Sequence, residues 1–365
     1  MAGIYIHIPF CRQACYYCNF HFATSLHYKN ELIAALLKEI VLQKDWLVDE
    51  TIETIYFGGG TPSLCTKAEI GDIITAIRST HTVAENAEIT LEANPDDITE
   101  EKLKEWNEAE INRLSIGIQS FFEEDLRWMN RAHDAKQAID NLQLAKKHFE
   151  NITIDLIYGT PQLTNEKWQQ NIQTALSLNI PHLSCYALTV EPKTPLDKMI
   201  KQHQSADIDP GKQSEQFLLL MQWMEEAGYE HYEISNFAKP GWRSRHNSSY
   251  WQGVNYLGLG PSAHSFNGKE RQWNISNNTA YIGSINKGIV PFEKEILTAT
   301  QKKNEYIMTS LRTMEGLNTG IAGKELLEKS KRFIDAGLMR MENDSLVLTK
   351  EGKLLADGIA AELFF

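Results

Sequence analysis

Three cysteine thiols stand within eight residues, at Cys11, Cys15 and Cys18, directly after the apolar run 4–10. Thiolates bind soft metals, and so dense a run in a chain with five cysteines indicates a metal site. A disulfide framework fits poorly, because three is odd and a chain of 365 residues has other sources of stability. A structural zinc site normally takes four ligands, and Phe20 stands where a fourth ligand would be sought.

An iron-sulfur cube held by three cysteines keeps its fourth iron open to a substrate or a cofactor. An open iron implies chemistry, so the spacing favours a 4Fe-4S cluster on Cys11, Cys15 and Cys18. A zinc site and redox-active thiols stay open as the two alternatives.

The elements that must position these thiols alternate along the first half of the chain. Apolar, β-branched runs predict strands over 4–8, 54–57, 88–92, 114–119, 152–157 and 182–188. The intervals between them predict helices over 29–44, 67–79, 100–109, 135–148 and 165–178, with Thr99 as the cap of the third. Such alternation is typical of an α/β fold with a parallel sheet, in which ligands gather at the carboxyl ends of the strands.

Polar and glycine residues follow the predicted strands at those ends. The cysteine loop follows the first strand, and the turn 58–62 (Gly-Gly-Gly-Thr-Pro) follows the second. The third predicted strand ends at Glu92 and the fourth ends in the segment 117–120. The fifth carries Asp155. We therefore expect one rim of the sheet to collect all of these groups.

The C-x3-C-x2-C spacing, with Tyr17 before the last cysteine, resembles the loop of radical S-adenosylmethionine (SAM) proteins. The preceding segment 5–10 (Tyr-Ile-His-Ile-Pro-Phe) narrows the resemblance to the coproporphyrinogen-oxidase-like branch. The resemblance implies a partial (β/α)6 TIM-like barrel that holds SAM beside the cluster. It implies that SAM is lined by Tyr5, Tyr17, Gly59, Gly60, Thr61, Glu92, Gln119, Arg131, Asp155 and Ala187. Taken singly, each acid or arginine among these also fits a helix cap or a solvated charge.

A second unusual stretch, 242–251, sets large aromatic residues beside two arginines and a histidine. A tetrapyrrole needs apolar walls, cations for its propionates and an axial ligand for its iron. The segment 246–251 also resembles the H-N-x-x-Y-W signature of the heme chaperones in this branch. The hypothesis that follows has His246 as axial ligand, Arg243 and Arg245 as propionate partners, and Tyr250 and Trp251 in the same motif. The alternatives are His264 as the ligand, or a packed aromatic loop in which His246 is only hydrogen-bonded.

The last part of the chain changes character and predicts two units, residues 1–280 and 281–365. Helices over 304–314, 319–328, 330–336 and 353–363, with a hairpin over 338–348, resemble a winged helix. Residues 290–365 carry 11 Lys and Arg against 12 Asp and Glu, whereas a DNA-binding wing would be basic. We therefore expect a lid or docking module and no nucleic-acid partner.

Composition and resemblance together give the functional hypothesis. No apolar run reaches the length of a membrane span and the N-terminus lacks a basic segment followed by an apolar one, so a cytoplasmic protein is expected. The net charge of −12 argues against general affinity for nucleic acid or anionic lipid. The hypothesis is a heme chaperone that carries a 4Fe-4S cluster and SAM and hands heme to an apoprotein, for example a respiratory-chain enzyme. Peripheral membrane contact and a homodimer are left open. The alternative is an oxygen-independent coproporphyrinogen III oxidase, which usually carries a fourth cysteine where Phe20 stands.

Overall fold

A curved mixed sheet is the centre of the fold. The computed structural model describes residues 1–47 and 49–365, and in them this sheet has twelve strands. Seven neighbouring strands are parallel: β9 (Asn255–Leu259), β1 (Ala2–Ile8), β2 (Ile52–Gly59), β3 (Val83–Ala93), β4 (Arg113–Gln119), β5 (Ile152–Tyr158) and β6 (His182–Ala187). Antiparallel strands extend both ends: β10 (His264–Phe266), β11 (Glu270–Asn274) and β12 (Phe292–Ile296) beyond β9, and β8 (Asn236–Ala238) and β7 (Glu230–Glu233) beyond β6.

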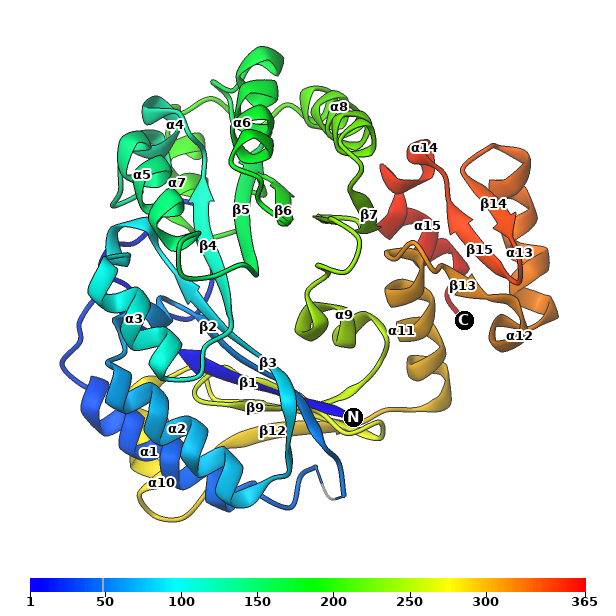
Figure 1. The fold of residues 1–365 in the computed structure, drawn as a ribbon. Coiled ribbons are helices and arrows are strands. Elements are labelled where there is room, and N and C mark those ends of the chain that lie inside the picture. The colour runs from blue at the N-terminus through cyan, green and yellow to red at the C-terminus, as the bar shows by residue number, and fades with distance from the viewer. Residues whose placement is uncertain (48) are drawn as a thin grey trace.

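Helices cover the outer side of this sheet, and the strands curve around an interior (Figure 1). They are α1 (Lys29–Leu42), α2 (Lys67–Thr80), α3 (Glu100–Glu108), α4 (Glu123–Trp128), α5 (Ala135–Ala145), α6 (Asn165–Ser177), α7 (Pro195–Lys201), α8 (Pro210–Glu226) and α10 (Asn278–Ile285). The short helix α9 (Arg245–Trp251) lies on the inner side instead, where its His246 stacks on Tyr56 of β2. All the predicted strands and crossover helices of the first half are present. Thr99 caps α3 as predicted, because its side chain accepts a hydrogen bond from the Lys102 amide.

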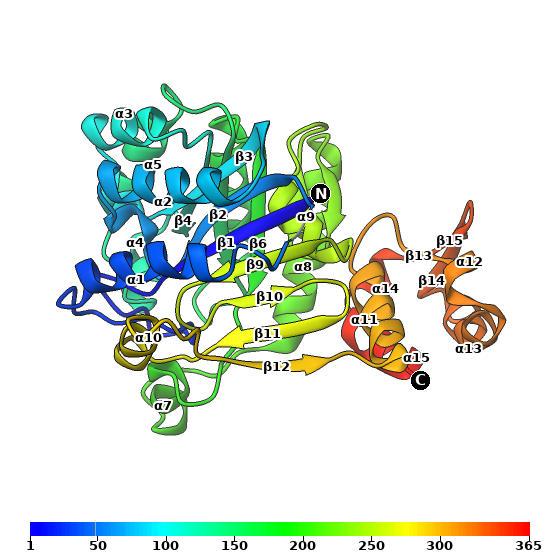
Figure 2. The same cartoon turned by 90° about the horizontal axis from the view of Figure 1, so that it is seen from below.

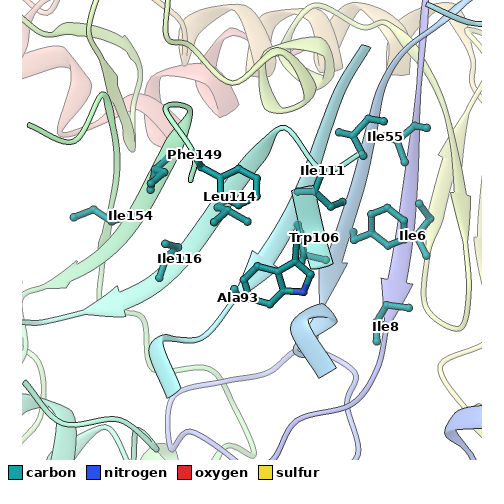
Figure 3. Packing of buried hydrophobic residues seen from close by; sticks show 14 of the residues in the cluster. Ile6, Ile8, Ile55, Ala93, Trp106, Ile111, Leu114, Ile116, Phe149 and Ile154 are labelled. Carbon is teal, nitrogen blue, oxygen red and sulfur yellow. The ribbon is translucent and has the colours of Figure 1, made fainter. Parts of the chain in front are cut away.

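The two faces of the sheet differ because side chains alternate along each strand. Ile4, Ile6 and Ile8 of β1 are fully buried in the main hydrophobic core, on the side of the outer helices. Figure 3 shows this layer of apolar side chains, among them Ile6 and Ile8 of β1 and Trp106 of α3. Tyr5 lies on the opposite face of β1, where its ring stacks on Tyr56 and His246. The outer face is therefore apolar packing, and the inner face carries the polar and aromatic side chains.

The segment 245–296 differs most from the sequence prediction. Residues 245–251, predicted as part of a polar loop, form α9, and residues 256–266, predicted as a glycine-rich turn, supply β9 and β10. The buried carboxylate of Glu39 in α1 accepts hydrogen bonds from the Gly260 amide and the Asn274 side chain, which follow β9 and end β11. Local sequence patterns cannot reveal such a long-range contact. Figure 2 shows the strands β9 to β12, which extend the sheet beyond β1.

A second hydrophobic core lies in the C-terminal part, where Leu311, Leu317, Phe333 and Leu346 are among the buried residues. Its elements are α11 (Ala299–Leu311), β13 (Leu317–Asn318), α12 (Thr319–Ala322), α13 (Lys324–Asp335), β14 (Met339–Glu342), β15 (Ser345–Leu348), α14 (Lys350–Lys353) and α15 (Ala356–Leu363). The predicted hairpin is present as β14 and β15, which pair antiparallel. The division after residue 280 and the likeness to a winged helix stay predictions. Among the described helices, none combines the length and the apolar character that crossing a bilayer needs.

Candidate functional site

The three thiols of the cysteine loop converge on a cavity of about 470 Å³ at the carboxyl ends of the parallel strands. The loop connects β1 to α1, and Cys11, Cys15 and Cys18 are each half-buried. Burial raises the pKa of the Cys11 thiol to about 11. A soft metal would displace that proton on binding, so the geometry and the donor type suit a metal better than a free nucleophile.

The glycine turn after β2 packs directly against the cysteine loop. A Cβ on Gly60 would lie 2.6 Å from the Phe10 carbonyl oxygen and 2.8 Å from the Ile8 carbonyl oxygen. Gly59 has a φ of +106°, which L side chains rarely adopt, and its amide donates a 3.1 Å hydrogen bond to Glu92 Oε2. The sequence requires glycine here because the backbone forms the cavity wall.

The structure brings most of the predicted SAM-lining residues into this one cavity. They come from the cysteine loop, from β2 to β6 or just beyond these strands, and, for Arg131, from the segment between α4 and α5: Tyr17, Gly59, Gly60, Thr61, Glu92, Gln119, Arg131, Asp155 and Ala187. Tyr5 is the exception, because it lies behind the cavity and its hydroxyl hydrogen-bonds with His7 Nδ1. The cavity lining also includes Asn94, Tyr186 and Glu191, which the sequence analysis did not single out.

Buried charge gives the cavity its electrostatic character. Burial raises the pKa of Glu92 to about 7 and that of Asp155 to about 6. Arg131 lies among them: its Nη2 donates to Asn94 Oδ1 and to the Gly117 carbonyl, and its Nη1 lies 3.3 Å from Cys15 Sγ. Its Nε is buried without a hydrogen-bond partner. Two acids and an arginine together can bind a ligand that carries both a cation and a carboxylate, as a zwitterionic amino acid does.

Gln119 carries a backbone distortion at the end of β4. Its φ is +67°, and the register between β4 and β5 shifts between Gly117 and Gln119. A non-glycine residue in this region is strained, and such strain clusters at ligand sites. The bulge turns the Gln119 side chain into the cavity lining, a detail that strand periodicity does not reveal.

A second cavity, of about 740 Å³, lies between the end of the sheet and α11. Three predicted heme-site residues line it: Arg243, Tyr250 and Trp251. The opposite walls were not predicted from the sequence, and they include Tyr256, Phe266, Arg271, Lys302, Tyr306 and Met308. Their aromatic side chains are dispersed over three elements, so only the fold brings them together.

The other predicted heme residues lie outside the lining of this cavity. His246 is buried, and both of its ring nitrogens are engaged, Nδ1 with Thr54 Oγ1 at 2.7 Å and Nε2 with the Tyr250 hydroxyl at 2.9 Å. The Arg245 side chain pairs with Glu53. His264 is exposed and stacks on Trp273. Ligation of iron by His246 would require Tyr250 to move aside.

Comparison with known proteins decides the family. The chain is 33% identical to the heme chaperone HemW of Bacillus subtilis (strain 168), over 98% of each chain. This chain belongs to the HemW heme chaperone family. HemW of Escherichia coli (strain K12) is 30% identical, over 99% of this chain and 97% of the relative. HemW of Mycobacterium tuberculosis (strain H37Rv) is 31% identical, over 99% of this chain and 94% of the relative.

The same comparison confirms the predicted fold class of this HemW-family chain. Residues 5–175 match the radical SAM superfamily. The solved structure of coproporphyrinogen III oxidase (HemN) from Escherichia coli superposes with a TM-score of 0.85, at 24% identity, over 100% of this chain and 90% of that one. The radical SAM type of barrel is therefore confirmed, and the radical SAM match of residues 5–175 implies a 4Fe-4S cluster and SAM as cofactors.

The donor set of the first cavity fits these two cofactors. In the described residues no group of three His, Cys, Asp or Glu side chains is gathered to hold a single metal ion. A cube is compatible with such spacing, because each thiolate binds a different iron. Cys11, Cys15 and Cys18 would hold the cluster, and the glycine turn, Glu92 and Arg131 line the same cavity.

Proposed function

We propose that this chain binds heme and transfers it to an acceptor apoprotein, using the first cavity for the cluster and SAM and the second for heme. The observation that carries the proposal is the pair of separate cavities, one lined by thiols and one by aromatic residues and cations. The full-length similarity to proteins named heme chaperones supports it. The acceptor as a respiratory-chain enzyme, a cytoplasmic location, peripheral membrane contact and a homodimer stay predictions.

The second cavity has the size and the chemistry that a planar dianionic macrocycle requires. Its volume of about 740 Å³ is within the range of cofactor sites. Tyr250, Trp251 and Tyr306 supply aromatic surface against which the porphyrin can pack. Arg243 and Arg271 supply cations, although Arg243 now pairs with Glu230 and Glu315, and Arg271 with Glu305. The propionates of heme would replace these carboxylates as partners of the arginines.

The residues of the first cavity would have distinct tasks. Cys11, Cys15 and Cys18 would hold the cluster, which supplies an electron to SAM when it is reduced. The acids would bind the positive groups of SAM, and Arg131 would offer its guanidinium to the carboxylate. Phe20, which is 67% exposed, lies at this cavity in place of a fourth thiolate. Arg245 and His246 stay proposals for the heme site, since neither lines the second cavity in this conformation.

A hemin titration tests the location of heme. Wild type should give a saturable bound-heme spectrum, and Trp251→Ala should weaken the affinity about tenfold, because it removes one wall of the cavity. Trp242→Ala is the matched control, since Trp242 lines a different hollow of the surface. Equal affinities in the two variants would place heme elsewhere. Conversion of coproporphyrinogen III under anaerobic conditions with SAM and a reductant would replace the carrier assignment with the oxidase.

Metal analysis tests the cluster independently. Anaerobic reconstitution should load iron and sulfide at about four each per chain, and Cys15→Ser should lose most of both. Cys65→Ala is the control, because Cys65 is buried away from the cavity lining. Stoichiometric zinc with no iron would favour the zinc alternative instead.

A further inference from the structure

A continuous series of contacts joins the two cavities through the inner face of the sheet. It begins at Glu92, which lines the first cavity and accepts hydrogen bonds from the Gly59 amide and from the Tyr56 hydroxyl, the latter at 2.8 Å. Tyr56 stands on β2, and only 7% of it is exposed. A ligand that binds Glu92 therefore contacts the same carboxylate to which the Tyr56 hydroxyl donates its hydrogen bond.

From Tyr56 the contacts continue to α9. The Tyr56 ring stacks on His246, with centroids 4.9 Å apart and planes 21° from parallel. His246 Nε2 hydrogen-bonds with the Tyr250 hydroxyl, and the Tyr250 ring meets Tyr256 edge-on at 4.7 Å. Tyr250 and Tyr256 both line the second cavity. Three side chains, Tyr56, His246 and Tyr250, thus span from one ligand site to the other.

His246 is held so firmly that it has little freedom to absorb a movement of Tyr56. Its Nδ1 hydrogen-bonds with Thr54 Oγ1 on the same strand as Tyr56, and its amide donates a 3.0 Å bond to Glu88 Oε1. Packed side chains with fixed hydrogen bonds transmit a displacement, because close packing leaves few voids into which they can relax.

We propose that SAM and heme bind cooperatively, coupled through Tyr56, His246 and Tyr250, with His246 as a positioning residue that holds Tyr250 in the wall of the heme cavity. The proposal rests on the function proposed above, which supplies heme as the second ligand. It gives His246 a task that needs no coordination of iron. The ligands in question are a sulfonium nucleotide with a free ammonium group and a planar dianionic macrocycle.

The sign of the coupling follows from the charge of SAM. The carboxylates that line the first cavity are Glu92, Asp155 and Glu191. A cationic ligand beside Glu92 holds it ionised, and a hydrogen bond to a carboxylate is about twice as strong as one to a neutral acceptor. Tyr56 is then fixed more firmly, and with it His246 and Tyr250, so the heme cavity is better preorganised. SAM should therefore tighten hemin binding, by about fivefold, the lower end of usual coupling factors.

The experiment measures the hemin Kd of anaerobically reconstituted protein with and without saturating SAM. No reductant is added, so that SAM is not consumed. Wild type should show the fivefold tightening, and equilibrium dialysis of SAM with and without hemin should give the same factor, because linkage is reciprocal. Tyr56→Phe and Tyr250→Phe each remove one hydroxyl of the series and should reduce the factor below about twofold. Tyr229→Phe is the matched control, since its buried hydroxyl bonds to the Ile180 carbonyl, away from both cavities.

The outcomes separate this proposal from the function on which it rests. A residue that is only structural would change the hemin Kd equally with and without SAM, so the ratio of the two Kd values is the decisive quantity. Saturable hemin binding that SAM leaves unchanged or weakens overturns the coupling alone. So does a ratio that stays fivefold in Tyr56→Phe and Tyr250→Phe. Absence of saturable hemin binding by wild type overturns the heme proposal, and the coupling with it.

Discussion

Replacing the buried Glu88 by glutamine should destabilise the fold more than the same replacement of Glu53, a more exposed acid on the neighbouring strand β2. Glu88 lies on β3, and its buried carboxylate accepts hydrogen bonds from the Arg245 and His246 amides at the start of α9, at 3.1 and 3.0 Å. The buried Arg113 guanidinium lies 3.8 Å from the same carboxylate. Glu88 therefore accepts hydrogen bonds from two amides at the N-terminus of α9 and also balances the charge of the buried Arg113.

The magnitude follows from what Glu88→Gln leaves behind. The amide keeps one acceptor oxygen but turns an NH2 group toward the second backbone N–H, and Arg113 loses the adjacent negative charge. Breaking a buried ion pair costs about 3 to 5 kcal/mol. The entropy of unfolding is about 2.1 cal/mol/K per residue, so for 365 residues it is about 0.8 kcal/mol/K. The expected Tm shift is the lost free energy divided by this entropy. The Tm should therefore fall by about 4 to 6 °C.

Differential scanning calorimetry of Glu88→Gln beside Glu53→Gln checks this reasoning. Glu53 pairs with the Arg245 side chain at the surface, where an ion pair contributes less than about 1 kcal/mol, so its loss should lower the Tm by about 1 °C. A Glu88→Gln shift no larger than that of Glu53→Gln would refute the buried pair as a source of stability.

Three further predictions concern the turn and two buried acids. Gly60→Ala should lower the Tm measured by calorimetry, because the new Cβ would lie 2.6 Å from a backbone oxygen. Gly71→Ala, in open space on α2, should leave the Tm unchanged or raise it. Burial raises the pKa of Glu92 to about 7, so protonation should weaken SAM binding about tenfold from pH 8 to pH 6; the same slope in Glu92→Gln would contradict this. Burial also raises the pKa of Glu39, whose stabilisation is present at low pH and lost as pH rises. The Tm of wild type should therefore fall relative to Glu39→Gln from pH 4 to pH 8, and a constant difference would refute it.

Local periodicity explains why the first half of the fold and its rim were predictable. The strands that end in the glycine turn, Glu92 and Gln119 are apolar runs separated by helical segments, and chain topology alone brings their ends to one edge. Tyr5 lies outside the lining of this cavity, and its contact with SAM stays a prediction. Its ring faces Tyr56 instead.

The second half was less predictable because its elements depend on distant partners. Strand β9 is short, and its place beside β1 is fixed by the contacts of Glu39 with Gly260 and Asn274, far away in sequence. The second cavity likewise combines Tyr256 with Tyr306 from another element. No periodicity within 242–251 could show that Arg243 and Trp251 line a cavity while Arg245 points to Glu53.

The outer edge strand β12 has a consequence for self-association. Glu293, Lys294 and Glu295 occupy the middle of this five-residue strand, and its side chains are mostly exposed. Charged groups on a short edge discourage another chain from adding a strand there, because two such edges would bring like charges together and leave them poorly solvated. Pairing of two copies through β12 is therefore disfavoured, and the sheet stays shielded from fibrous growth on that side.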